Sequence, residues 1–299
     1  MSHALHVRDR DLRVHGGGPS DFVMTAADFG RIAAMLQEDA GIHLGPSKAT
    51  LVYSRLAKRL RSLGLDSFQA YCTLVGADDG AEERRHMMAA LTTNVTRFFR
   101  EPHHFDHLRT QVLPPLLEAA RRGGRVRLWS AACSSGEEPY SIALTILALM
   151  PDAASFDVKV LATDINPGMV THGRRGVYED TELRDVPAEL KARWFTAATD
   201  DCAGSWRAAD ELRALVTFRE LNLIGNWPMR GAFQAIFCRN VVIYFDDETQ
   251  SRVWGRIIPL LASDGCLYIG HSERVSGPAA DALRSEAITT YRRRNGVRA

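Results

Sequence analysis

The stretch of this sequence best suited to bind a ligand is VRLWSAACSSGEEPYSIA, residues 126–143. Val126, Leu128 and Trp129 predict a buried strand, small residues up to Gly136 predict a tight turn, and Glu137 begins an apolar helix. Such a strand, turn and helix N-terminus form the ligand-binding turn of open α/β sheets. Glu137 and Glu138 stand where a pyrophosphate would bind and would repel it. We therefore expect a nucleoside with a positive centre and hydroxyl groups, such as S-adenosylmethionine; an ordinary turn before a charged helix is the alternative.

An acidic residue closes the next strand predicted for this sheet. The strand spans residues 158–162, and Asp164 follows it. A carboxylate at the end of the second strand accepts hydrogen bonds from ribose hydroxyls in nucleoside-binding folds. Each charge-assisted bond of this kind contributes about 1.5–3 kcal/mol. Asp164 is alternatively the cap of a helix that begins near Pro167.

The segment FQAIFCRNVVIYF, residues 233–245, predicts the central strand of the sheet and the turn after it. Arg239 and Asn240 stand at the carboxyl end of that strand, where open α/β sheets bind ligands. Polar groups inside an apolar run are costly unless each one is hydrogen bonded, so we predict that both belong to a site. Asn222 and Leu223 follow the preceding strand in the same way.

A further unusual segment is LTTNVTRFFREPHHF, residues 91–105, which is too aromatic for a linker and too polar for a core. Three polar side chains alternate with its apolar ones: Asn94, Thr96 and Arg100. The segment precedes the α/β region, and clefts form at such junctions, so we predict a site; a packing segment between domains is the alternative. The helix predicted next carries three histidines: His103, His104 and His107. They have no evident fourth ligand, and we predict no metal site.

The composition indicates a soluble globular protein. Of its 299 residues, 45% are hydrophobic and 24% are charged, and the net charge of +1 gives no general attraction to nucleic acid or to a membrane surface. The longest apolar stretch, residues 142–150, is too short to span a bilayer, and the N-terminus has no apolar core of the kind found in signal peptides. The five cysteines show no C-x-x-C spacing. We therefore expect reduced thiols, a cytoplasmic location and no insertion into the membrane.

The order of polar and apolar patterns divides the chain. It predicts a disordered tail at 1–20, an all-α domain at 21–91, a helical linker at 92–125 and an α/β domain at 126–299. The alternation of strands and helices breaks at about 176–216, which indicates a small inserted β subdomain. Within the all-α domain, Thr25 and Asp28 predict a capping box at the start of the first helix.

The second helix predicted in the all-α domain has a basic face. Its cations are Lys48, Arg55, Lys58, Arg59 and Arg61. No acidic residue occurs between Ser47 and Leu65 to compensate them. The face is either simply solvated or a docking surface for an acidic partner.

Six blocks occur in order along the chain: TTNVTRFFRE, WSAACSSGEEPYSIAL, ATDINPGMV, RGVY, AIFCRNVVIYFD and GCLYIGHSE. Together they resemble the chemotaxis receptor methyltransferases, the CheR family, over residues 25–291. One block alone would be a weak signal, but six in order are not expected by chance. The resemblance implies a Rossmann-like methyltransferase domain that uses S-adenosylmethionine, with an all-α N-terminal domain and an inserted β subdomain.

The resemblance also implies an activity and a set of site residues. The reaction would move the methyl group of S-adenosylmethionine to glutamate side chains on the cytoplasmic helical bundle of a chemoreceptor, giving methyl esters and S-adenosylhomocysteine. Residues matching the family's cofactor-binding positions are Asn94, Thr96, Arg100, Glu138 (or Glu137 in its place), Asp164, Asn222, Leu223, Arg239 and Asn240. Arg100 and Tyr244 are the two expected to act on the acceptor glutamate.

The implied partners fit two features of the chain. The basic helix face would steer docking of the acidic receptor bundle. The β subdomain holds a receptor's C-terminal tail in part of the family. Here the loop at 196–205 contains Gly204 as its only glycine and is rich in alanine and aspartate, which leaves tail binding open.

The implied chemistry needs few catalytic groups. A glutamate side chain has a pKa of about 4.3 and is already ionised at pH 7, so no general base is required. Correct orientation of the reacting atoms supplies up to about 7–11 kcal/mol. We expect Arg100 to hold one carboxylate oxygen and Tyr244 to steady the geometry.

Two other functions stay open at the level of sequence. One is a module that binds S-adenosylmethionine and signals with weak or no turnover. The other is a methyltransferase for a different acceptor, although the near-neutral charge disfavours a nucleic acid.

Overall fold

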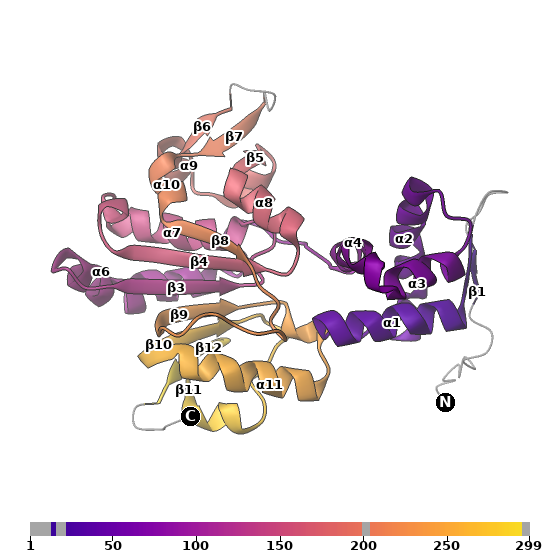
Figure 1. The fold of residues 1–299 in the computed structure, drawn as a ribbon. Helices are drawn as coiled ribbons and strands as arrows, with labels where there is room; N and C mark the ends of the chain where they lie inside the picture. The colour runs from indigo at the N-terminus through magenta and orange to yellow at the C-terminus, as the bar shows by residue number, and fades with distance from the viewer. Residues whose placement is uncertain (1–12, 16–21, 199–203, 295–299) are drawn as a thin grey trace, which may run out of the picture. The chain divides into compact units, whose positions relative to one another are not determined.

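The computed structural model describes residues 13–15, 22–198 and 204–294, and the chain divides into two units, Met1–Thr93 and Asn94–Ala299 (Figure 1). Most of the tail predicted to be disordered, residues 1–20, lies outside the described residues. Arg13–His15 form strand β1, which pairs antiparallel with β2, Val23–Thr25. The prediction of disorder is therefore wrong for these three residues, because their backbone pairs with a neighbouring strand.

The described part of unit 1 is mainly helical. Its helices are α1 (Ala26–Ala40), α2 (Ala49–Leu63), α3 (Phe68–Gly76) and α4 (Ala81–Leu91). The capping box predicted at the start of α1 is confirmed: the N–H of Asp28 donates to the Thr25 hydroxyl at 3.2 Å, and the N–H of Thr25 donates to the Asp28 carboxylate at 3.0 Å. Apolar side chains at helical spacing, such as Ile32 and Leu36 of α1 and Leu56 of α2, are completely buried and form the core.

Unit 2 is built on a seven-stranded sheet with the order β11-β12-β10-β9-β3-β4-β8. Its strands are β3 (Val126–Ala131), β4 (Val158–Asp164), β8 (Val216–Glu220), β9 (Phe233–Cys238), β10 (Leu261–Ile269), β11 (Leu283–Ala287) and β12 (Thr290–Arg293). The strands from β10 to β8 are parallel, and β12 and β11 continue the sheet antiparallel. The strand order reverses between β3 and β9, so the crevice outside their carboxyl ends is the expected ligand site of such a sheet.

Helices of unit 2 cover the strands of this sheet (Figure 1). They are α5 (Pro102–His107), a π-helical turn (Leu108–Val112), α6 (Leu113–Arg121), α7 (Glu137–Leu149), α8 (Pro167–Arg175), α9 (Ala188–Trp194), α10 (Asp210–Ala214) and α11 (Asp247–Ile257). Helix α6 packs on β3, α7 packs on β3, β4 and β8, and α8 packs on β4 and β8. Residues 94–125 belong to this unit, since Phe105 and Leu117 are buried in its core.

The inserted β subdomain is confirmed as a three-stranded antiparallel sheet with the order β5-β7-β6. Its strands are β5 (Val177–Glu179), β6 (Phe195–Ala197) and β7 (Ser205–Ala208). The part of its loop at 199–203, where the sequence left tail binding open, lies outside the described residues. Among the helices that the structure describes, none has the length and apolar character needed to cross a membrane.

Candidate active site

The turn between β3 and α7 has a fixed, left-handed backbone. Ala132, Ser134 and Gly136 have φ angles of 60°, 50° and 106°. Gly136 is required there, because a Cβ would lie 2.7 Å from the hydroxyl oxygen of Tyr178. The N–H of Ser134 donates to Asp164 Oδ2 at 2.8 Å, which ties the turn to the end of β4. The turn is therefore shaped before a ligand binds.

Asp164 ends β4 beside this turn. Its Oδ1 accepts the N–H of Asn166 at 2.9 Å, and burial raises the pKa of the Asp164 carboxyl, although the N–H groups of Asn166 and Ser134 oppose that shift. Each carboxylate oxygen retains a second lone pair, so Asp164 can still accept bonds from two neighbouring hydroxyls. Asp164 is not the cap of α8: Asn166 is the N-cap, and its Oδ1 accepts the N–H of Gly168 at 2.9 Å.

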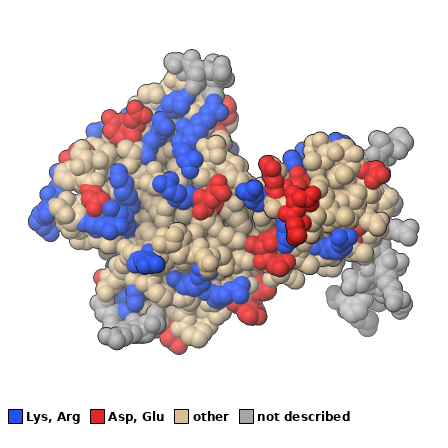
Figure 2. Space-filling model, in the orientation of Figure 1, with Lys and Arg blue, Asp and Glu red and all other residues tan. Residues whose placement is uncertain are grey.

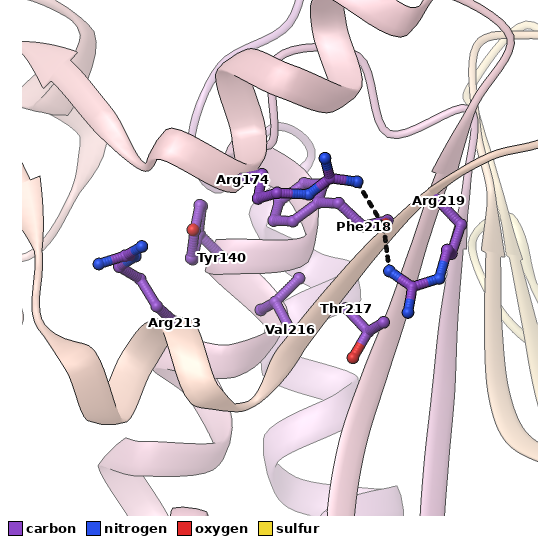
Figure 3. A pocket seen from close by; sticks show the side chains of 7 residues that line it. All are labelled: Tyr140, Arg174, Arg213, Val216, Thr217, Phe218 and Arg219. Atoms are coloured by element: carbon purple, nitrogen blue, oxygen red, sulfur yellow. Dashed lines mark hydrogen bonds between the residues drawn. The ribbon is translucent and has the colours of Figure 1, made fainter.

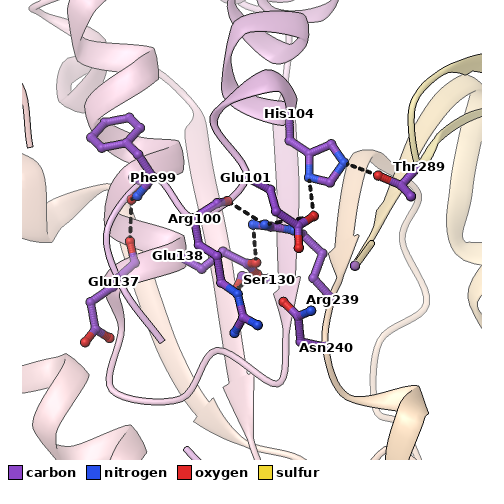
Figure 4. Close-up of polar contacts among 12 residues, drawn as sticks. Phe99, Arg100, Glu101, His104, Ser130, Glu137, Glu138, Arg239, Asn240 and Thr289 are labelled. Carbon is purple, nitrogen blue, oxygen red and sulfur yellow. Dashed lines mark hydrogen bonds and ion pairs between the residues drawn. The ribbon is translucent and has the colours of Figure 1, made fainter. Parts of the chain in front are cut away.

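A buried ionic network lies at the ends of β3 and β9 (Figure 4). Nη1 of Arg239 donates to Glu138 at 3.0 Å, and its Nη2 donates to the backbone carbonyl of Arg100. Glu138 also accepts the Ser130 hydroxyl at 2.6 Å. The Arg239 side chain is 2% exposed and the Glu138 side chain 12%. The Arg239 guanidinium therefore links Glu138 to the backbone of Arg100, and its predicted contact with the cofactor stays a prediction.

Glu101 completes this network and was missed in the sequence. It has a left-handed φ of 60°, and its Oε2 lies 3.4 Å from Nη2 of Arg239. Burial alone would raise the pKa of Glu101, but the hydrogen bond from His271 and the charge of Arg239 lower it to about 2. Glu101, His103 and His104 have ligand atoms within 4.8 Å of one another. The adjacent Arg239 guanidinium would repel a metal ion there.

The segment that carries Asn94, Thr96 and Arg100 lies against the turn. The hydroxyl of Ser134 donates to the carbonyl of Asn94 at 2.9 Å, and the Arg100 guanidinium donates to the carbonyl of Val95 at 3.0 Å. Figure 4 shows the Arg100 side chain pointing away from the Arg239 network. Arg100 is thus held through its backbone and by one N–H, which leaves its other N–H groups for a substrate.

Glu273 shapes the loop after β9, and it too was missed in the sequence. This residue is 4% exposed, and its carboxylate accepts the N–H groups of Asn240, Val241 and Val242 at 2.8–2.9 Å and that of Gly270 at 2.6 Å. Asn240 has a φ of 57°, which is uncommon for a residue with a side chain. The four bonds therefore hold the Asn240 loop in an unfavourable conformation.

Replacing Glu273 with glutamine is expected to lower methyl transfer by at least about tenfold, because a backbone N–H would face the new amide N–H₂ group and one bond would be lost. The measurement is kcat/KM for methyl transfer, with folding checked by circular dichroism. Glu286→Gln is the matched control, since Glu286 pairs with Arg292 in the surface hairpin of β11 and β12. Equal activity of the two variants would show that the hydrogen bonds accepted by Glu273 do not contribute to methyl transfer.

The remaining predicted residues of unit 2 lie at the same edge of the sheet. Asn222 and Leu223 follow β8, which pairs with β4 so that Asp164 is opposite Glu220. Asn222 Oδ1 accepts the N–H of Ile224 at 3.1 Å, and Leu223 is buried. The half-buried Tyr244 belongs to a short 3₁₀ turn two residues beyond the bonds to Glu273.

Two cations of the basic face predicted for the second helix have partners within unit 1. Arg55 donates to the carbonyls of Leu91 and Thr92 at 2.8 Å, where it satisfies the C-terminal end of α4. Arg59 pairs with the buried Glu83, which also accepts the Tyr71 hydroxyl at 2.9 Å. Both guanidinium groups are thus committed within unit 1, because a buried carboxylate and a helix C-terminus each need a donor. Three predicted docking residues are exposed: Lys48, Lys58 and Arg61.

The carboxylates of the site fit a nucleoside that carries positive charge and lacks phosphate. Asp164 offers two lone pairs to vicinal hydroxyls, as in a ribose. Two carboxylates stand at the start of α7, where phosphate groups would otherwise bind the helix N-terminus. Burial raises the pKa of both Glu137 and Glu138; the Ser135 hydroxyl opposes this at Glu137, and Arg239 opposes it at Glu138. These observations match S-adenosylmethionine and oppose a nucleotide.

Comparison with known proteins agrees with this geometry. Residues 94–292 match the model of the CheR methyltransferase S-adenosylmethionine-binding domain, and residues 27–92 match that of the CheR methyltransferase all-α domain. A probable chemotaxis protein methyltransferase of Rhizobium etli is 53% identical over 86% of this chain and 96% of its own length. Chemotaxis protein methyltransferase 2 of Pseudomonas aeruginosa is 44% identical over 92% of this chain and 95% of its own. The chemotaxis protein methyltransferase of Escherichia coli is 42% identical over 85% and 86%. The chain belongs to the CheR methyltransferase family.

Proposed function

We propose that this methyltransferase transfers the methyl group of S-adenosylmethionine to glutamate side chains of chemoreceptor cytoplasmic domains, giving glutamyl methyl esters. The observation that supports this acceptor most directly is Arg100, whose backbone and guanidinium are both held while several of its N–H groups stay available. A planar guanidinium is well suited to orient a carboxylate. When bound, S-adenosylmethionine supplies an electrophilic methyl carbon and leaves as S-adenosylhomocysteine.

The roles of the chain's own residues follow from their positions. Asp164 binds the ribose hydroxyls, and Glu138 faces the positive end of the cofactor. Arg100 holds one oxygen of the acceptor carboxylate and leaves the other free to attack, while Tyr244 limits the motion of the acceptor. Asn94, Thr96, Asn222, Leu223 and Asn240 line the cofactor. No proton has to be removed, because a glutamate with a pKa of about 4.3 is ionised at pH 7.

Replacing Asp164 with asparagine is expected to weaken S-adenosylhomocysteine binding by at least about tenfold. The amide N–H₂ group of asparagine cannot accept a hydrogen bond from a ribose hydroxyl, and it would face a backbone N–H group. Isothermal titration calorimetry measures the affinity, and circular dichroism confirms folding. Asp157→Asn is the matched control, because Asp157 pairs with Arg127 at the surface beside the start of β4. Unchanged affinity in Asp164→Asn would remove Asp164 from the cofactor site.

Changing two exposed lysines to glutamate, Lys48 just before α2 and Lys58 within it, is expected to raise the KM for receptor several-fold and to reduce its salt dependence. Both side chains are exposed, so the change should leave S-adenosylhomocysteine affinity and folding intact. Initial rates with a receptor fragment at increasing salt give the comparison. Arg85→Glu, on the surface of α4, is the control. A KM equally affected by Arg85→Glu would contradict docking by the α2 face.

The same proposal includes the location of the enzyme and a second contact with the receptor. The acceptor lies on the cytoplasmic side of a receptor, so the enzyme works in the cytoplasm; the described cysteines are free and buried, as expected of reduced thiols. Among the described residues, the outer strands β5 and β6 each pair with β7 alone, and a receptor's C-terminal tail would add beside one of them as a further strand. A receptor fragment without its tail tests this: an unchanged KM would exclude tail binding.

A further inference from the structure

A cationic pocket lies at the outer edge of β8, the last strand of the large sheet (Figure 3). Its volume is about 240 Å³. Three arginines from three elements line it: Arg174 of α8, Arg213 of α10 and Arg219 of β8. The pocket shares none of the residues assigned above to cofactor or acceptor, and Figure 2 shows lysine and arginine side chains gathered on the face that carries α8, α10 and β7.

Two of these arginines converge on a single neutral acceptor. Nη2 of Arg174 and Nη1 of Arg219 donate to the carbonyl of Phe218, at 3.2 Å and 2.9 Å. Among the described residues, neither has a carboxylate within ion-pair distance, so no negative charge offsets their mutual repulsion. An anion that bridges the two guanidinium groups would relieve that repulsion.

Arg213 adds a third positive charge to the pocket. Its Nη1 lies 3.3 Å from Asp210, whose side chain is 95% exposed, so solvent weakens this pair. Within the described chain, its buried Nε has no hydrogen-bond partner. A group carrying more than one negative charge gains more from three such cations than a single carboxylate does.

The shape of the pocket favours a compact ligand over an extended peptide. A peptide that added to the free edge of β8 would have to donate an N–H group to the carbonyl of Phe218, and both arginines already occupy that oxygen. The floor is rigid, because Tyr140 and Phe218 are buried and the Tyr140 hydroxyl donates to the carbonyl of Gly173 at 2.9 Å.

We propose that this pocket binds a small phosphate-bearing ligand, a phosphomonoester or a diphosphate, through Arg174 and Arg219 with Arg213 beside them. The guanidinium fork matches two oxygens of a phosphoryl group, and a doubly charged phosphoryl group fits the excess of positive charge better than a carboxylate. The site shares no residue with those assigned to the cofactor or the acceptor.

Calorimetric titration of the full chain with inorganic diphosphate at low ionic strength tests the proposal. Saturating S-adenosylhomocysteine keeps the cofactor site occupied. We expect saturable binding of one equivalent, and an affinity at least about tenfold lower in Arg174→Gln with Arg219→Gln. The control removes the same charge elsewhere: Arg121→Gln with Arg122→Gln, exposed at the end of α6, should retain the affinity within about twofold.

Three results would overturn the proposal: no saturable binding to the unmodified chain, an equal loss in both double variants, or tighter binding of a tetraglutamate peptide that depends on Arg174 and Arg219. The last would identify a site for acidic protein segments. If the glutamine variant does not fold, Arg174→Lys with Arg219→Lys keeps the charge and removes the bidentate fork, and it should still lower the diphosphate affinity several-fold.

Discussion

Replacing Arg100 with alanine should lower the kcat of receptor methylation by about 10²–10³-fold, because the acceptor carboxylate loses the group that orients it. The affinity for S-adenosylhomocysteine should be largely retained, since Asp164 and the turn after β3 do not depend on the Arg100 side chain. Single-turnover rates with a receptor fragment and calorimetric titration of S-adenosylhomocysteine separate the two effects.

Arg97→Ala is the matched control for this experiment. Arg97 lies in the same segment, is half exposed and pairs with Asp185 at 3.0 Å in a surface ion pair. Exposed pairs of this kind contribute little, so methylation should stay within about twofold of the unmodified enzyme. Normal turnover by Arg100→Ala would remove Arg100 from the mechanism.

Replacing Arg239 with methionine should reduce the free energy of unfolding of unit 2 by about 3–5 kcal/mol, because Glu138 and Glu101 would remain buried without their cation. Methionine preserves most of the length of the arginine side chain, so the loss of charge dominates. Tryptophan fluorescence during urea denaturation reports on this unit alone, because all five tryptophans lie beyond Thr93.

The loss should shrink as the pH falls. Without Arg239 the pKa of Glu138, which burial already raises, rises further, and the pKa of Glu101 is lowered less. The folded variant therefore binds more protons than the folded unmodified protein, and its deficit shrinks toward acid pH. The difference from the unmodified protein should therefore be smaller at pH 5.5 than at pH 8. Arg127→Met, which breaks a partly exposed pair with Asp157, should cost less than about 1 kcal/mol at either pH. A similar, pH-independent loss in both variants would contradict the role given to Arg239.

Local patterns explain how much of the fold and site could be predicted. The strand, turn and helix of residues 126–143 are continuous in sequence, and parallel strands bring their carboxyl ends to one edge. The positions of Asp164, Asn222 and Asn240 at one edge of the sheet therefore follow from three strand predictions. The structure also excludes Asp164 as the cap of α8, because Asn166 occupies the N-cap position.

Contacts between distant segments explain what was missed. Glu101 meets His271, 170 positions later, and Glu273 meets Asn240 33 positions earlier. No local pattern marks a carboxylate whose partners are backbone N–H groups or side chains so far away.

The basic face of α2 illustrates the same limit. Arg55 and Arg59 have the helical spacing of solvated cations, yet the end of α4 and the buried Glu83 are their partners. Charge periodicity shows which side of a helix is basic, but only the packing of α4 against α2 shows which cations are committed within unit 1.

The measurement that tests the central claim most directly is transfer of label from methyl-labelled S-adenosylmethionine to a receptor cytoplasmic fragment, followed by mild base. The proposed reaction predicts that label enters the receptor and is released by base as methanol, as expected of a glutamyl methyl ester. Label that stays bound after base treatment would mean a nitrogen or carbon acceptor. S-adenosylmethionine that binds without any transfer across a panel of receptors would indicate a sensor, and either result would contradict glutamate methylation.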